Sequence, residues 1–249
     1  YSGFRAEFQN CTFKNVFFGH PSLCDVTKLW DAGFTQTILN SVKIAATKRI
    51  EVAHVTMQHT LGDLALQTSD STTSTSSISW TNGQIIRSEL DFVFGHLSLG
   101  GQNGVVTFAD NQIASSNLKA TFFSHISSGD ATGLTLAQNV FYRCRLTLNV
   151  YASSNTSSND ETMNAPLVIF ASNTYKESHL FDWVIFAESE EGSAGMIISD
   201  TFAKTLLCNG AFNSSSILDM RSSTFNEAQI ADTDFEGSPL YWPFETTVD

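Results

Sequence analysis

Large apolar residues recur along the chain at fixed distances in sequence from one small or polar residue. In the stretch that begins at Phe108, Asn111 follows three places on, Ile113 two places after that, and Leu118 five places further. A unit this short cannot bury its apolar residues alone. The pattern therefore predicts repeats that bury a common core by stacking on one another.

The pattern can be placed nine times if each unit is anchored on its small or polar residue. The positions three before and two after the anchor are then apolar in every unit. A column seven residues after the anchor is apolar except at Gly62, and a column twelve residues after it keeps six apolar residues, among them Phe123 and Tyr151. The steps between anchors are 26, 18, 28, 28, 28, 34, 27 and 23 residues. The anchors are Cys11, Thr37, Val55, Gly83, Asn111, Asn139, Asn173, Asp200 and Ser223.

Within a unit, apolar and polar residues alternate over short runs such as 106–108 and 134–136. This period of two is typical of β-strands, and no stretch keeps a helical period for three turns. Asn, Asp or Ser at the anchor can satisfy backbone groups at a bend and can form a polar ladder between stacked units. The sequence predicts an all-β parallel solenoid of about nine coils. A β-sandwich with regular turns is the alternative, although it would not need the same residue type at the same place in each unit.

The succession of units, from about Phe8 to Phe235, resembles the right-handed parallel β-helix of the pectin-lyase-like superfamily. The resemblance implies a three-sheet coil with a stacked apolar interior. It does not imply an enzyme, because the superfamily also includes adhesins, phage tail proteins and surface filaments. Residues 6–18 also resemble pentapeptide repeats, which build a squarer solenoid, but this five-residue period fades after about Leu23. We expect a β-helix over residues 1–237 and a C-terminal tail or end cap over residues 238–249.

Composition and charge narrow the class of partners. The 249-residue chain is 42% hydrophobic and has no apolar run near the roughly 18 residues of a membrane span, so no membrane span is expected in this segment. Residues 159–249 carry three basic and fifteen acidic side chains, so the whole net charge of −12 lies in this last third. Nucleic-acid binding is not expected, because phosphate backbones require clustered Lys and Arg. We interpret the acidic third as a solvated surface, with docking of a basic partner or of calcium as the alternative.

The cysteines have neither a C-x-x-C motif nor a metal-ligand spacing. We expect Cys144 and Cys208 to be free thiols, whereas Cys11 and Cys24 could form a bridge. No repeat begins before about Phe8 and no signal peptide precedes it, which suggests a processed product or a domain of something longer.

Three glycosylation sequons begin at Asn10, Asn155 and Asn213, no more than the Ser, Thr and Asn content yields by chance. Asn155 lies in the inserted segment 153–165, where a glycan would be tolerated. A second excursion is expected over residues 68–77, which are rich in Ser and Thr. The Ser/Thr-rich composition favours an extracellular or cell-surface location.

Signatures of catalysis are missing from the sequence. Polysaccharide lyases on this scaffold resemble one another in using clustered aspartates for calcium and an Arg or Lys as base, but Arg143 and Arg145 have no acidic cluster near them in the sequence. The four motifs of pectin hydrolases do not occur either. We therefore assign no catalytic residue, no cofactor and no metal ligand.

The best group of carboxylates is Asp232, Asp234 and Glu236, which alternate along one predicted strand while Phe235 points into the core. Such a set could hold a hard cation or act as an acid/base pair. It is also what the solvent-facing side of any half-buried strand shows. We carry it forward as a candidate acidic interaction face.

These observations favour a non-enzymatic structural or adhesion solenoid module of a larger extracellular or cell-surface assembly. It would act as a rigid spacer or as a surface for other proteins of the assembly or for neighbouring solenoid segments. The alternative is a β-helix that binds or cleaves polysaccharides, with the acidic face meeting Lys204 in a groove. End-to-end self-assembly is a third hypothesis, because the first coil has no obvious polar cap.

Overall fold

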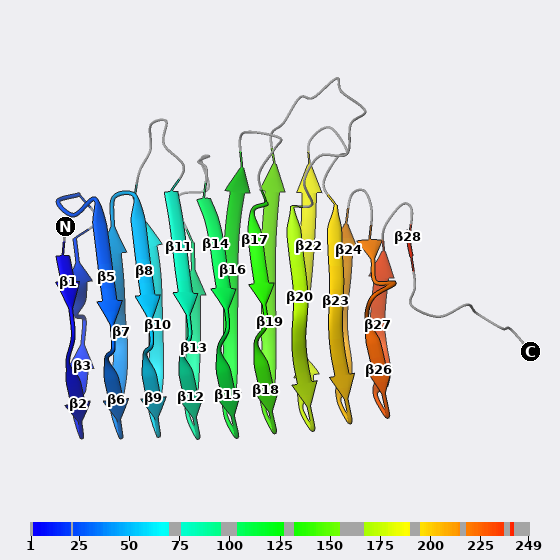
Figure 1. Ribbon diagram of the computed structural model, residues 1–249, viewed down its shortest axis with the longest axis horizontal. Helices are drawn as coiled ribbons and strands as arrows, with labels where there is room; N and C mark the ends of the chain where they lie inside the picture. Colours follow the sequence, from blue (N-terminus) through cyan, green and yellow to red (C-terminus); the bar gives the residue numbers. More distant parts are fainter. Residues whose placement is uncertain are drawn as a thin grey trace, which may run out of the picture.

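The computed structural model describes residues 2–20, 22–69, 76–95, 104–126, 132–154, 167–189, 195–214, 218–236 and 240–241. Throughout these residues the regular secondary structure is β, and the strands form two sheets, which we call sheet A and sheet B. The strand pairings within both sheets are parallel, as in the pairing of β14 (Gly104–Ala109) with β17 (Leu134–Ala137). In Figure 1 the arrows of sheet A point down and those of sheet B point up. The arrangement is consistent with a β-solenoid, and it overturns the β-sandwich alternative, whose strands would pair antiparallel.

The remaining strands of sheet A are β1 (Ser2–Phe4), β2 (Glu7–Gln9), β5 (Val26–Trp30), β6 (Gly33–Thr35), β8 (Arg49–Ala53), β9 (Thr56–Gln58), β11 (Ser76–Thr81), β12 (Gln84–Ile86), β15 (Gln112–Ala114), β18 (Val140–Tyr142), β20 (Val168–Lys176), β23 (Met196–Ala203), β25 (Leu218–Asp219), β26 (Thr224–Asn226) and β28 (Leu240–Tyr241). Sheet B consists of β3 (Thr12–Lys14), β4 (Phe17–Gly19), β7 (Ile38–Ala46), β10 (Leu61–Thr68), β13 (Glu89–Phe94), β16 (Asn117–Ile126), β19 (Arg145–Ser154), β21 (His179–Phe181), β22 (Val184–Ser189), β24 (Leu206–Ser214) and β27 (Gln229–Glu236).

Each unit contains two bends, and β14, β15 and β16 show the plan. The chain leaves β14, bends at Asp110 and Asn111, forms β15, bends again at Ser115 and Ser116, and continues as β16. The next unit repeats this path one level along the rod. The three separate sheets that the resemblance implied are not found, because β20 and β23 run without a break through the first bend and join the first two strand positions of a unit into sheet A.

The bends depend on residues in the left-handed region of backbone space. Asp110 and Ser115 have φ values of 58° and 52°, and the described part of the chain contains many other non-glycine residues like them. Within a unit these residues lie five apart, as at Ser172, Glu177 and Asp182. The five-residue spacing that fades from the sequence after Leu23 therefore persists in the backbone.

The register of sheet A corrects the alignment of the first two units. Phe8 pairs with Phe34, and Phe34 pairs with Met57 rather than with Val52. The anchors Cys11 and Thr37 therefore lie at the second bend, level with Thr60, and not at the first bend with Val55. The error is five residues because both bends have the same local pattern, an apolar residue three places before a small one and another two places after it. The first-bend residues are Ala6 and Ala32, and the first two steps are 26 and 23 residues.

A ladder of side-chain amides connects the first bends inside the rod. Asn111 Nδ2 donates to Asn139 Oδ1 at 2.9 Å, and Asn139 Nδ2 donates to Asn173 Oδ1 at 2.8 Å. The backbone N–H of Gly83, Asn111 and Asn139 donates to the Oδ1 of the next unit as well. The run of amides ends at Asp200, which accepts from Asn173, and the backbone N–H of Asp200 in turn donates to Ser223 Oγ at 3.4 Å. The predicted polar ladder is confirmed, and it satisfies backbone groups that a buried bend would otherwise leave unpaired.

A second ladder connects the second bends through hydroxyl groups and one thiol. Ser88 Oγ accepts from the N–H of Thr60 at 3.0 Å, and Ser178 Oγ accepts from the N–H of Cys144 at 3.1 Å. Each of these side chains also donates to a backbone carbonyl of the preceding unit, as Thr60 Oγ1 does to Phe34 at 2.9 Å. The ladders therefore hold consecutive units in a single register.

The apolar side chains of both sheets meet in one continuous core. Ring stacks run along the rod, and the centroids of Tyr175 and Phe202 are 4.9 Å apart. The column twelve residues after the anchor is not one core column, since Phe123 and Tyr151 are 37% and 42% exposed, whereas Ile185 and Phe212 are buried. The later units carry one extra residue in sheet B, at Asp182 and its equivalents, which turns the following residues to the opposite face. Within the described residues, no helix has the length and apolar character needed to cross a membrane.

Candidate functional site

The outer face of sheet B carries the polar side chains that could serve function. In β13, β16 and β19 the leucines Leu90, Leu118 and Leu146 point inward and are buried. Their neighbours point outward and line up along the rod because the strands pair in register. Two rows result, which we call the first and second outer rows. The first outer row is Thr12, Ile38, Leu61, Glu89, Asn117, Arg145, His179, Leu206 and Gln229. The second outer row includes Asp63, Asp91, Lys119 and Thr147.

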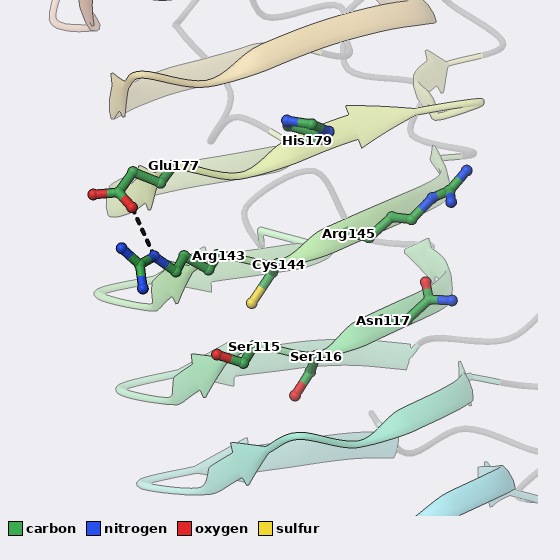
Figure 2. Close-up of a pocket in the computed structure, with 8 residues that line it drawn as sticks. All are labelled: Ser115, Ser116, Asn117, Arg143, Cys144, Arg145, Glu177 and His179. Carbon is green, nitrogen blue, oxygen red and sulfur yellow. Dashed lines mark hydrogen bonds and ion pairs between the residues drawn. The ribbon is translucent and has the colours of Figure 1, made fainter.

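Two adjoining depressions along these rows form a groove. The larger, about 610 Å³, runs over both rows from Leu61 to Phe181, and the smaller, about 370 Å³, lies between Ser115 and His179. Both are lined by Asn117 and Arg145, so the groove is continuous at these two side chains. Figure 2 shows the smaller depression, with Asn117, Arg145 and His179 following one another on consecutive levels of sheet B.

Charges in the groove are only partly paired. Lys119 Nζ lies 3.1 Å from Asp91 Oδ2. The guanidinium of Arg145 lies over the ring of Phe181, 4.1 Å from its centroid. Among the described residues, no carboxylate lies within 4.0 Å of Arg145, so its N–H donors face the groove. Stacking on the ring fixes the plane of this cation and makes Arg145 the best-prepared group of the groove for an external carboxylate.

The two arginines that flank Cys144 have different surroundings. Arg143 Nε donates to Glu177 Oε2 at 2.8 Å and lies over the ring of Tyr142. This hydrogen bond holds the pKa of the Glu177 carboxyl below its usual value and raises the pKa of Arg143. A guanidinium held this way is a poor proton acceptor. The structure therefore offers no support for Arg143 as a lyase base.

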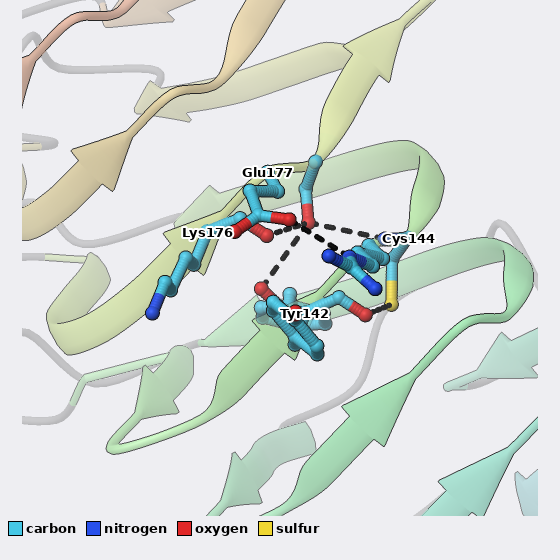
Figure 3. A network of polar contacts seen from close by, with 7 residues as sticks. Tyr142, Cys144, Lys176 and Glu177 are labelled. Carbon is cyan, nitrogen blue, oxygen red and sulfur yellow. Dashed lines mark hydrogen bonds and ion pairs between the residues drawn. The ribbon is translucent and has the colours of Figure 1, made fainter.

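Cys144, which lies between these arginines in the sequence, is buried at the second bend. Figure 3 shows it beside Tyr142. Its Sγ donates to the carbonyls of Ile113 and Tyr142, each at 3.3 Å. Burial raises the pKa of its thiol, and a thiol with little thiolate character is a weak nucleophile. Cys144 therefore has a structural place in the second ladder, which connects the second bends.

The predicted acidic face is solvent-exposed at one end of sheet B. Asp232 lies in a left-handed bend with φ 48°, so it does not continue the alternation of Asp234 and Glu236. Glu236 Oε2 accepts from Asn213 Nδ2 at 2.7 Å. Lys204 lies 3.8 Å from Glu227 rather than in a groove with the predicted set. Phe235 packs against the core as predicted.

No group of three or more His, Cys, Asp or Glu side chains is placed to hold a metal ion in the part of the chain that the structure describes. All four cysteines are free thiols, and only Cys144 is buried. Of the sequon residues, Asn10 is exposed at a bend, Asn213 is half-buried in β24, and Asn155 lies outside the described residues.

Comparisons of the chain with protein-family models, curated proteins and solved structures give no match. The groove residues Glu89, Asn117 and Lys119 were not singled out from the sequence. In the sequence they are marked only by their position. Each lies one residue before or after a leucine that follows an anchor by seven places.

Proposed function

We propose that the chain is a non-enzymatic structural solenoid, a right-handed parallel β-helix of about nine coils related in plan to the pectin-lyase-like superfamily. It serves in a larger extracellular or cell-surface assembly as a rigid spacer and as a surface for other proteins. The acidic face of Asp232, Asp234 and Glu236 and the sequons remain predicted features of this surface.

The observation that carries the proposal is the unbroken parallel pairing of strands along the rod. Backbone pairing runs from β1 to β28, and the amide ladder follows the same axis through Asn111, Asn139 and Asn173. Parallel strands about 4.8 Å apart on nine levels give a rod on the order of 40 Å long. Each unit contacts only the units next to it, and the ladders allow a single register between adjacent units. A fixed register keeps the rod rigid, as a spacer requires.

Small-angle X-ray scattering combined with a cleavage assay tests this proposal. At protein concentrations low enough to keep the chain monomeric, we expect an elongated particle whose maximum dimension does not change between low and high salt. We also expect no new reducing or unsaturated ends when the protein is incubated with neutral and acidic polysaccharides. Release of such ends would overturn the non-enzymatic role, and a compact or salt-dependent shape would overturn the rigid spacer.

The groove favours a second candidate, a polysaccharide-binding solenoid. Arg145 offers donors for acidic groups, while Glu89 and Asp63 offer acceptors for hydroxyl groups along the same groove. Calorimetric titration with acidic and neutral oligosaccharides tests it. Binding that is lost in Arg145→Ala and kept in Arg143→Ala, a matched change outside the larger depression, would support this role.

A further inference from the structure

We propose that the outer face of sheet B binds a second copy of this chain in an antiparallel, two-fold symmetric dimer centred on β16. This dimer proposal rests on the assembly role proposed above, and it identifies the partner in that assembly as a second copy of the chain. Strand β16 is the middle level of sheet B, with four further levels on each side, from β13 to β3 and from β19 to β27.

The residues of the first outer row on the two sides of Asn117 have complementary chemical character. One step away on either side stand Glu89 and Arg145, both exposed and of opposite charge. Three steps away stand two apolar residues, Ile38 and Leu206. At the ends of the row the polar residues Thr12 and Gln229 correspond. Two steps away Leu61 corresponds to His179, whose ring can pack on an aliphatic side chain.

A two-fold axis parallel to β16 makes the two rods run in opposite directions. Each outer row of one copy then faces the same row of the other copy. Glu89 of one copy then faces Arg145 of the second copy, and by symmetry this contact forms twice in the dimer. Isologous contacts of this kind are the commonest way in which identical chains associate. The stacking of Arg145 on Phe181 prepares its donors for the incoming carboxylate.

The other outer positions agree with this axis. The two Lys119 side chains approach each other, but each is neutralised by its own Asp91 at 3.1 Å. At the other end of β16, Phe123 is 37% exposed and stacks on Tyr151, with ring centroids 5.4 Å apart. The axis brings the two Phe123 rings together and places Tyr151 of each copy against Gly95 of the other, a residue without a side chain.

The size of the face suits a stable dimer. Nine levels at about 4.8 Å and strands of about eight residues at about 3.3 Å each give a face of roughly 40 Å by 25 Å. This is on the order of 1,000 Å² per copy, and specific interfaces bury about 800 Å² per partner. Exposed large apolar residues on this face, such as Ile38 and Leu61 at 46% and 47%, would be covered.

The experiment exploits the symmetry of the Glu89–Arg145 contact. Analytical ultracentrifugation of the intact chain is expected to show a monomer–dimer equilibrium that weakens with added salt. The variants Glu89→Arg and Arg145→Glu each place like charges at both contacts, so each alone should lose at least about tenfold in dimer affinity. A one-to-one mixture of the two variants restores both contacts, one as in the wild type and one with its charges exchanged, so we expect heterodimers of near wild-type affinity.

Matched controls use exposed charged residues at a bend and at a turn. Asp110→Arg at the first bend and Lys48→Glu at the turn between β7 and β8 lie outside both outer rows and should leave the equilibrium unchanged. A chain that stays monomeric at every concentration overturns the dimer, and so does a mixture that fails to associate. The spacer role would survive either result, because it is judged by the shape of the single rod.

Discussion

Asn173 donates its amide to both carboxylate oxygens of Asp200, at 3.0 and 3.2 Å. A ladder of neutral amides therefore ends on an acid that is only 1% exposed. Burial raises the pKa of Asp200 from 3.8 to about 7, even though hydrogen bonds from Asn173 and from the Tyr175 hydroxyl favour its ionised form. The same burial, with the nearby carboxylate, raises the pKa of Tyr175. Near neutral pH the end of the ladder can change its charge.

The first prediction concerns the pH dependence of stability. Because the folded-state pKa of Asp200 lies above its unfolded value, its proton stabilises the fold below about pH 4, and this contribution is lost as the pH rises through about 7. The loss is on the order of 2–4 kcal/mol in the free energy of unfolding between pH 4 and pH 8. Asp200→Asn keeps the acceptor oxygen and removes the titration. The variant should therefore be more stable than the wild type at pH 8, with the difference shrinking toward pH 4.

Urea unfolding followed by circular dichroism at several pH values measures this difference. Comparison of wild type and variant cancels the other carboxylates, including Glu177 and Asp219, whose lowered pKa values act below about pH 4. A difference that stays constant from pH 4 to pH 8 would contradict the assignment to Asp200.

The second prediction concerns the interior of the ladder. Asn139 donates to the Phe108 carbonyl and to Asn173, and it accepts from the backbone and side chain of Asn111. Asn139→Ala leaves several buried groups without partners and should lower the free energy of unfolding by about 3–5 kcal/mol. The exposed Asn117→Ala is the control, with a change within about 0.5 kcal/mol. Equal effects in the two variants would show that the ladder does not stabilise the rod.

The third prediction concerns backbone strain at the bends. Arg87 is exposed, has φ 49°, and donates its backbone N–H to Ala114. Asn adopts this conformation more easily, so Arg87→Asn should raise stability by about 0.5 kcal/mol, whereas the β-branched Arg87→Val should lower it by about 1–2 kcal/mol.

Thermal unfolding distinguishes the two Arg87 variants. Gln84→Val, at an exposed position of strand β12, controls for the valine side chain itself and should be tolerated, because β-branched residues suit extended backbone. An Arg87→Val variant as stable as the wild type would rule out left-handed strain at this bend.

The fourth prediction concerns Cys144 as a ladder member. Oxygen accepts hydrogen bonds more strongly than sulfur, so Cys144→Ser should match Ser116 and Ser178 and leave stability unchanged or raise it by up to about 1 kcal/mol. Cys144→Val removes the donor to the Ile113 carbonyl and should lower stability by about 1–3 kcal/mol.

Thiol labelling provides an independent readout for Cys144. In the native protein the half-buried Cys11, Cys24 and Cys208 should react with an aromatic disulfide reagent before Cys144 does. Cys144→Ser should remove the one thiol that reacts only on unfolding. Rapid labelling of four thiols in the folded wild type would contradict the buried position.

Most of the apolar columns were readable from the sequence because large apolar residues that recur at a fixed place in each unit are usually buried. Phe141, Leu146 and Phe170 are in the core where the pattern placed them. The alignment of Cys11 and Thr37 was not readable, because two bends five residues apart present the same local pattern. Which bend stacks on which depends on hydrogen bonds to the neighbouring unit, such as that from Thr60 to the Phe34 carbonyl.

The candidate site was hidden for a related reason. Glu89, Asn117 and Arg145 are polar residues on exposed strand positions, and many sequences of such residues satisfy the same fold. They become one row because strands β13, β16 and β19 pair in register, although the residues lie 28 positions apart in the chain.

The amino-acid sequence by itself determined that this protein is a stack of short strands around an apolar core, with small or polar residues at its bends. That follows from local periodicity, which each unit carries within itself. Only the tertiary structure decided which bends form a ladder, that its amides end on the titratable Asp200, and which outward side chains become neighbours. These relationships belong to the pairing between units, where backbone hydrogen bonds select one register from several that the local pattern allows.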